Sequence, residues 1–134
     1  MPSIAYLENL ATVTVFAATS IITTALSGTP TVVDRNTAAS ENAKGCDEVA
    51  LFANVTVAPA AATALNAWVQ WSYDGTNYTV AEYCATAAVA ISATGYHIIG
   101  PVKMLAPYAK FYLRAPTATL TAALFASPSY YEGQ

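Results

Sequence analysis

The stretch from Ala67 to Ala85 constrains the fold most, because it contains two β-rich runs separated by one turn signal. The turn is Asp-Gly-Thr-Asn at residues 74–77, in which glycine and asparagine tolerate a positive φ angle. In a strand every second side chain faces the same way, so the run before the turn has two faces. We expect one face to be in the core: Val69, Trp71 and Tyr73. The other face is left outside, with Trp68 at a rim or interface beside Gln70 and Ser72.

Short β-rich runs and turns make up the rest of the chain. Glu48 to Val57 alternates clearly, and the residues expected on its buried face are Val49, Leu51, Ala53, Val55 and Val57. Weaker runs cover residues 12–24, 31–34, 88–91, 96–99 and 119–125. Helical periodicity is almost absent. The sequence therefore predicts an all-β protein, an antiparallel β-sandwich that is jelly-roll-like or immunoglobulin-like, with about seven or eight strands.

A chain of 134 residues is long enough for one core, and folding buries roughly two-thirds of its extended surface. We expect an N-terminal arm over residues 1–10, a single sandwich domain over 11–126 and a C-terminal tail over 127–134. Residues 36–45 contain nothing apolar larger than alanine, so they are expected to form an exposed loop or one helical turn. Cys46 and Cys84 are expected to be free thiols.

Composition argues against several classes of function. Only 10% of the residues are charged and the five basic residues are scattered, so the backbone of a nucleic acid is not an expected partner. The apolar run Ala11 to Leu26 is interrupted by threonines and is shorter than the ~20 residues of a spanning helix. Glu8 stands where a signal peptide has basic residues. We therefore expect a soluble protein that is neither exported nor bound to a membrane.

Catalytic signals are weak throughout the sequence. His97 is the only histidine, and the chain has no nucleophile elbow, no metal-ligand spacing and no glycine-rich phosphate loop. Glu82 has no second carboxylate in a convincing local relation, which gives little support to a glycosidase. The sequence predicts a protein that is not an enzyme and that uses no cofactor or metal.

The segment Tyr108 to Arg114 carries the surface that most resembles a binding site. Its alternation sends Ala109, Phe111 and Leu113 inward. The side chains left outside form a stripe of aromatic and cationic groups: Tyr108, Lys110, Tyr112 and Arg114. Such a stripe fits either a partner or cross-strand pairing on a solvated face. Together with Trp68 and Gln70, it is the candidate interaction surface.

The order of these motifs resembles the small β-sandwich proteins of tailed-bacteriophage virions. The resemblance extends from about Thr12 to Phe125. It depends on an alternating Thr/Val opening, the turn Ser-Gly-Thr-Pro-Thr-Val-Val-Asp, the strand Val-Ala-Leu-Phe-Ala-Asn-Val-Thr-Val, the hairpin Val-Gln-Trp-Ser-Tyr-Asp-Gly-Thr-Asn-Tyr, and the late pair Ala-Lys-Phe-Tyr-Leu-Arg with Ala-Thr-Leu-Thr-Ala-Ala-Leu. It implies a head decoration, or cement, protein made in the host cytoplasm. Such a protein sits on the outer capsid as trimers and binds and stabilises the major capsid protein.

Two other functions remain open at this point. A tail or fibre component of the virion would use the same surface. A carbohydrate-binding module would stack sugar rings on Trp68, Tyr108 and Tyr112, with Gln70 or Asn77 making polar contacts.

Overall fold

The computed structural model describes residues 6–9, 12–35 and 46–132, with the backbone alone at 6–9 and 130–132. These residues form strands and loops without any helix, which confirms the predicted all-β class. The nine strands are β1 (Tyr6–Asn9), β2 (Val13–Ile21), β3 (Val33–Asp34), β4 (Glu48–Val57), β5 (Asn66–Ser72), β6 (Glu82–Thr86), β7 (Gly95–Lys103), β8 (Tyr108–Arg114) and β9 (Leu120–Glu132). No helix in the described part of the chain is long and apolar enough to cross a membrane.

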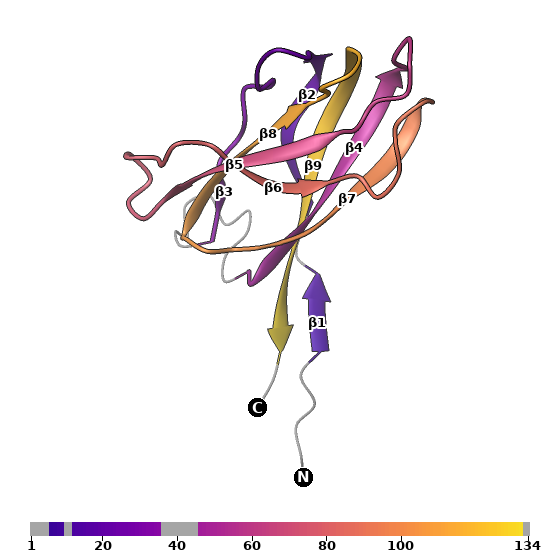
Figure 1. Ribbon diagram of the computed structural model, residues 1–134. Coiled ribbons are helices and arrows are strands. Elements are labelled where there is room, and N and C mark those ends of the chain that lie inside the picture. The colour runs from indigo at the N-terminus through magenta and orange to yellow at the C-terminus, as the bar shows by residue number, and fades with distance from the viewer. Residues whose placement is uncertain (1–5, 10–11, 36–45, 133–134) are drawn as a thin grey trace.

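Two antiparallel sheets form a sandwich, as predicted (Figure 1). One sheet has the order β2-β9-β4-β7, with β1 also paired to β9, and the other has the order β3-β8-β5-β6. Each strand from β2 to β5 therefore pairs with one from β6 to β9: β2 with β9, β3 with β8, β4 with β7 and β5 with β6. This is a long hairpin rolled into two sheets, which is the arrangement of an eight-stranded jelly roll.

The segment from Ala67 to Ala85 is the tip of this rolled hairpin, because β5 and β6 are its innermost pair. The predicted turn is present, and Gly75 has a φ angle of 79°. However, β6 begins only at Glu82, so strand pairing does not resume directly after the turn. Residues 73–81 instead form a loop that projects from the sandwich (Figure 1).

The core lies between the sheets and contains the residues that period-two alternation predicts. Val49, Leu51 and Phe111 have no exposed surface, and Trp71 is 8% exposed. The ring of Trp71 packs edge-on against Phe111 with 6.4 Å between ring centroids. Two core predictions were wrong: Val57 is 57% exposed and Tyr73 is 76% exposed. Val57 and Tyr73 each lie beyond the last position at which the opposite sheet covers their segment.

The C-terminal boundary also needs correction. β9 does not end at Phe125 but continues to Glu132, so most of the predicted tail is strand. The extension has partners on both sides, since Ser129 lies opposite Glu48 of β4 and Asn9 of β1. β1 belongs to the predicted N-terminal arm, and it pairs with β9 below the sandwich (Figure 1).

Other segments differ in detail from the predictions. Within residues 12–24 there is one strand, β2, which covers only Val13–Ile21 and has irregularities beside Phe16. Residues 88–91 contribute only an isolated bridge between Thr63 and Ile91. β7 continues through Gly100 and Pro101, where its end was predicted, because it has a bulge there: Ile99 and Gly100 lie opposite the single residue Leu51 of β4. The loop predicted over residues 36–45 lies outside the described residues. Cys46 and Cys84 are free thiols, as predicted.

Candidate interaction surfaces

The predicted interaction residues lie together on the outer face of the four-stranded sheet. The register places Gln70 opposite Lys110, Trp68 opposite Tyr112, and Asn66 opposite Arg114. Ala109, Phe111 and Leu113 are buried beneath them, which confirms the predicted phase of β8. The six predicted side chains are half-buried rather than fully exposed: Trp68, Gln70, Tyr108, Lys110, Tyr112 and Arg114.

Internal contacts use much of this predicted surface. The hydroxyl of Tyr112 donates to Gln70 Oε1 at 2.7 Å, and Gln70 Nε2 donates to the carbonyl of Thr79 at 3.1 Å. The ammonium of Lys110 lies 4.1 Å from the ring centroid of Tyr78, a cation–π contact. Burial raises the pKa of the Tyr112 hydroxyl, so it stays protonated as this donor. Gln70, Lys110 and Tyr112 therefore hold the 73–81 loop against the sheet.

Asp74 orders the loop, because its carboxylate accepts three hydrogen bonds from Thr76 and Asn77. Oδ1 accepts from the backbone N–H groups of Thr76 at 2.9 Å and Asn77 at 2.8 Å. Oδ2 accepts from the side-chain amide of Asn77 at 2.8 Å. These bonds favour the charged carboxylate and hold the pKa of Asp74 well below its usual range. The loop is also close to the sheet, because a Cβ on Gly75 would lie 3.3 Å from the Tyr108 ring.

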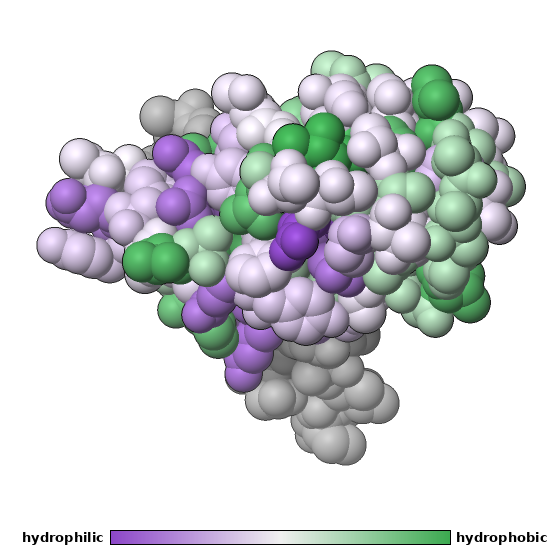
Figure 2. All heavy atoms as spheres, turned by 45° about the horizontal axis from the view of Figure 1, so that its top comes forward, coloured by the Kyte–Doolittle hydropathy of each residue, from purple (hydrophilic) through white to green (hydrophobic). Residues whose placement is uncertain are grey.

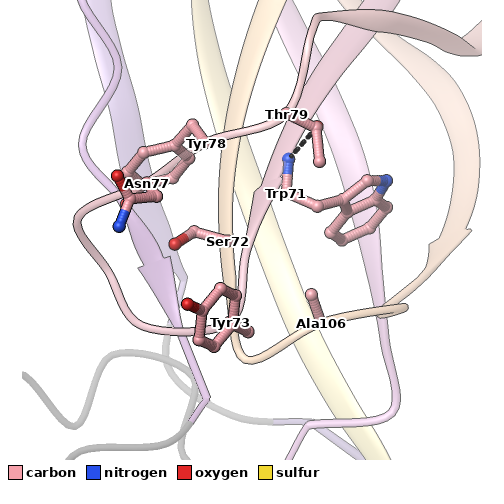
Figure 3. A pocket seen from close by; sticks show the side chains of 7 residues that line it. All are labelled: Trp71, Ser72, Tyr73, Asn77, Tyr78, Thr79 and Ala106. Atoms are coloured by element: carbon pink, nitrogen blue, oxygen red, sulfur yellow. Dashed lines mark hydrogen bonds between the residues drawn. The ribbon is translucent and has the colours of Figure 1, made fainter.

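A pocket of about 390 Å³ opens where the loop leaves β5. Figure 3 shows the rings of Tyr73 and Tyr78 on two sides of Ser72, with the indole of Trp71 on a third side. Asn77, Thr79 and Ala106 complete the lining. No lining residue is charged, so the pocket suits a neutral ligand. Apart from Asn77, this site does not overlap the predicted sugar-binding residues.

A second hollow lies at the other end of the outer face, between Trp68 and Arg114. It measures about 240 Å³, and the remaining lining residues are Thr24, Ala25, Leu26 and Ala81. Trp68 packs edge-on against Tyr83 at 6.1 Å, and its indole Nε1 is buried with no hydrogen-bond partner among the described residues. A buried donor without an acceptor costs about 1–3 kcal/mol.

Sequence reasoning missed an apolar patch on the outer face of the five-stranded sheet. Phe52 of β4 lies opposite Ile98 of β7 on one side and Phe125 of β9 on the other. Tyr96 extends the row, because its ring centroid is 6.5 Å from that of Phe125. We call Phe52, Tyr96, Ile98 and Phe125 the outer patch. Tyr96 is 71% exposed and Ile98 is 49% exposed.

The sequence contains a signal for the outer patch. Within Glu48 to Val57, Phe52 is out of phase with the buried valines and leucine, so it faces away from the core. An outward phenylalanine in a strand with a complete buried face indicates a possible contact surface. Glu48 and Lys103 lie opposite each other at the ends of β4 and β7 away from the outer patch.

On the face that Figure 2 shows, hydrophilic side chains are unevenly distributed. Figure 2 shows hydrophilic side chains at the end where the 73–81 loop projects. Paler and more hydrophobic side chains cover the opposite end, where β4 ends and β7 begins. On this face the loop end is the more polar one, but the loop is not uniformly polar, since Val80 is 89% exposed.

Reactive groups are few in the described residues. Burial raises the pKa of the Cys46 thiol to about 11 and that of Cys84 to about 12, so both stay protonated at neutral pH. Glu82 accepts a hydrogen bond from the Trp71 indole at 2.9 Å, which is a structural role. The Nε2 of His97 lies 3.4 Å from the carbonyl oxygen of Ala93. No group of three or more metal-ligating side chains occurs in the residues that the structure describes.

The sandwich and its surfaces define the chain as a β-sandwich protein with a jelly-roll strand order. No protein-family model matches it, and no curated protein or solved structure is significantly similar to it.

Proposed function

We propose that this protein is a structural component of a virion, a decoration protein that binds and stabilises the assembled shell of a major capsid protein. The outer patch carries this proposal. It is a flat row of aromatic and aliphatic side chains that crosses three adjacent strands, β7, β4 and β9. Contiguous exposed apolar side chains of this kind mark interaction sites on soluble proteins.

The chemistry of the outer patch fits a protein partner. Aromatic side chains are enriched at protein interfaces, and charged side chains are depleted from interface cores. Phe52 and Phe125 are half-buried in the sheet, so little conformational freedom is lost when a partner covers them. The free thiols and the jelly-roll strand order are compatible with a shell protein, although a fold alone does not determine a function.

Many weak contacts are sufficient for a decoration protein. A trimer that binds through three copies of the outer patch gains avidity, because the second and third contacts form at a high effective concentration. We propose such a trimer on the outer surface of the capsid, where this small chain stabilises the shell by linking neighbouring subunits.

Tyr96→Lys is expected to weaken binding to shells that lack this protein by at least about tenfold, because it places a charge within an apolar contact. The side chain is 71% exposed, so the folded state should keep its stability. Binding is measured by co-sedimentation of the purified chain with such shells, and the oligomeric state by light scattering.

Val80→Lys is the matched control, since Val80 is 89% exposed and lies in the 73–81 loop, away from the outer patch. It should bind like the unmodified chain. Equal binding by both variants would show that the outer patch is not the docking surface. A chain that neither binds the shells nor self-associates would refute the decoration function.

A carbohydrate-binding module is the second candidate, and the pocket in Figure 3 favours it. A pyranose ring has one apolar face that stacks on aromatic rings, and its hydroxyls bond to amides. The pocket offers the rings of Tyr73 and Tyr78, and the side-chain carbonyl of Asn77 has no hydrogen bond within the described chain. Jelly rolls also occur among lectins.

Tyr73→Ala tests this second function, because the side chain is 76% exposed and contributes little to the core. For any glycan that the unmodified chain retains on an array, the variant is expected to bind about tenfold more weakly through loss of stacking. Tyr83→Ala, at 52% exposed and outside the pocket, should leave the affinity unchanged. An array without any retained glycan would remove this candidate.

A further inference from the structure

The outer edge of β7 lacks a paired strand. β7 is the last strand of its sheet and pairs with β4 alone, and no backbone hydrogen bond joins its other edge to the rest of the described chain (Figure 1). The opposite sheet approaches β7 near Gly100, where a Cβ would lie 3.8 Å from the Cβ of Ala85 in β6. At Gly95, by contrast, a Cβ would have no atom within 4 Å. The first half of β7, residues 95–98, therefore presents unpaired backbone groups in open space.

The other edges of the sandwich have features that discourage pairing with another chain. Short strands, charged side chains, proline and bulges all act in this way. β3 has two residues, β1 has four, and β6 begins with the charged Glu82. The edge of β2 is partly occupied, since Thr31 donates its N–H to the carbonyl oxygen of Val15 at 2.7 Å. The second half of β7 has a bulge, Pro101 and Lys103, whereas its first half, Gly-Tyr-His-Ile, has none of these features.

We propose that two copies of this chain pair through the first halves of their β7 strands, antiparallel about a two-fold axis that passes between the two His97 residues. The segment is complementary to itself, because Tyr96 and Ile98 lie at equal distances from His97 along the strand. Tyr96 of each copy then lies opposite Ile98 of the other, and an aromatic side chain opposite a β-branched one stabilises antiparallel strands. No charged side chain lies within residues 95–99, and Lys103 remains outside the pairing.

This pairing also extends the outer patch. A two-fold axis perpendicular to the sheet leaves the outer faces of both copies on the same side. Tyr96 and Ile98 are 71% and 49% exposed on that face, so the two outer patches become one continuous apolar surface. The contact joins two copies whether or not they also form the proposed trimer, and it does not depend on the proposed virion function.

His97→Cys tests this register in the full chain without any shell. Directly opposite residues of antiparallel strands have Cα atoms about 4.5–5.5 Å apart, a distance that a disulfide spans. We expect mild oxidation to give a disulfide-linked dimer on a non-reducing gel. Lys103→Cys is the matched control, because it is exposed on the same strand but far from the axis, and it should stay a single chain. The unmodified chain should also stay single, since the thiols of Cys46 and Cys84 are buried or half-buried and protonated.

Ile98→Lys should weaken self-association by at least about tenfold in analytical ultracentrifugation, because the pairing brings two ammonium groups close together across the axis. Val80→Lys, at an 89% exposed position in the 73–81 loop, should associate like the unmodified chain. The proposal is overturned if His97→Cys gives no more cross-linked dimer than Lys103→Cys, or if Ile98→Lys associates like the unmodified chain. It is also overturned if Ile98→Cys cross-links more readily than His97→Cys, since that result would mean that the outer patches meet face to face.

Discussion

Replacing Trp71 by alanine is expected to lower the free energy of unfolding by about 3–5 kcal/mol, as for other large aromatic residues in a core. Trp71 is 8% exposed and packs edge-on against Phe111 of β8, the neighbouring strand in the same sheet. The change also removes the donor to Glu82. Equilibrium urea unfolding of the variant and the unmodified chain measures the difference. The midpoint should fall while the dependence on urea stays similar.

Trp68→Ala provides the matched comparison, because Trp68 is three residues earlier on the same strand but on the outer face. Its side chain is half-buried and contacts Tyr83, so the expected loss is only about 1 kcal/mol. If Trp68→Ala were the more destabilising change, β5 would be shifted by one residue, since a single-residue slip exchanges the two faces of a strand.

Strands with one regularly apolar face were predictable from sequence. β4 and β8 have the predicted bounds, because every second residue in each is apolar and the intervening residues are mostly polar or aromatic. That alternation reports directly which face meets the opposite sheet. Trp71 was placed in the core by the same reasoning, whereas Tyr73 failed because alternation does not tell where the covering sheet ends.

Features that depend on distant partners were not predictable in this way. The end of β9 contains Pro128 and has no clear alternation, and it is a strand because β1 and the start of β4 supply partners from far away in the sequence. Gly100 and Pro101 are a turn signal, yet they remain within β7, because β7 has a bulge of one extra residue opposite Leu51 of β4. Pairing of this kind is a property of the whole fold rather than of the local segment.

The candidate surfaces were likewise predictable only where they depend on local alternation and not where they depend on distant partners. The sequence predicted that Tyr112 and Arg114 face outward, since they alternate with the buried residues of β8. The loop that covers part of that face was not, because the contacts of Tyr78 and Gly75 with β8 join residues about thirty positions apart. The outer patch similarly requires knowing that β7, β4 and β9 are neighbours.

Gly28→Ala is expected to be as destabilising as the loss of Trp71, by about 3–5 kcal/mol, through two separate effects. The φ angle of Gly28 is 108°, a conformation that side chains with a Cβ rarely adopt. A Cβ there would also lie 2.5 Å from Cε2 of Phe16, which is 6% exposed and fixed in the core. The ring cannot move away without disturbing close-packed neighbours.

Gly95→Ala separates these two effects. Gly95 has a similarly unfavourable φ of 127°, but a Cβ there would have no atom within 4 Å. This variant should lose only the backbone contribution, about 1–3 kcal/mol by urea unfolding. Adding Phe16→Leu to Gly28→Ala should make the double variant more stable than the sum of the two single losses implies, because the smaller side chain relieves the clash. Strictly additive losses would mean that Phe16 does not restrict residue 28 and that backbone conformation alone requires glycine there.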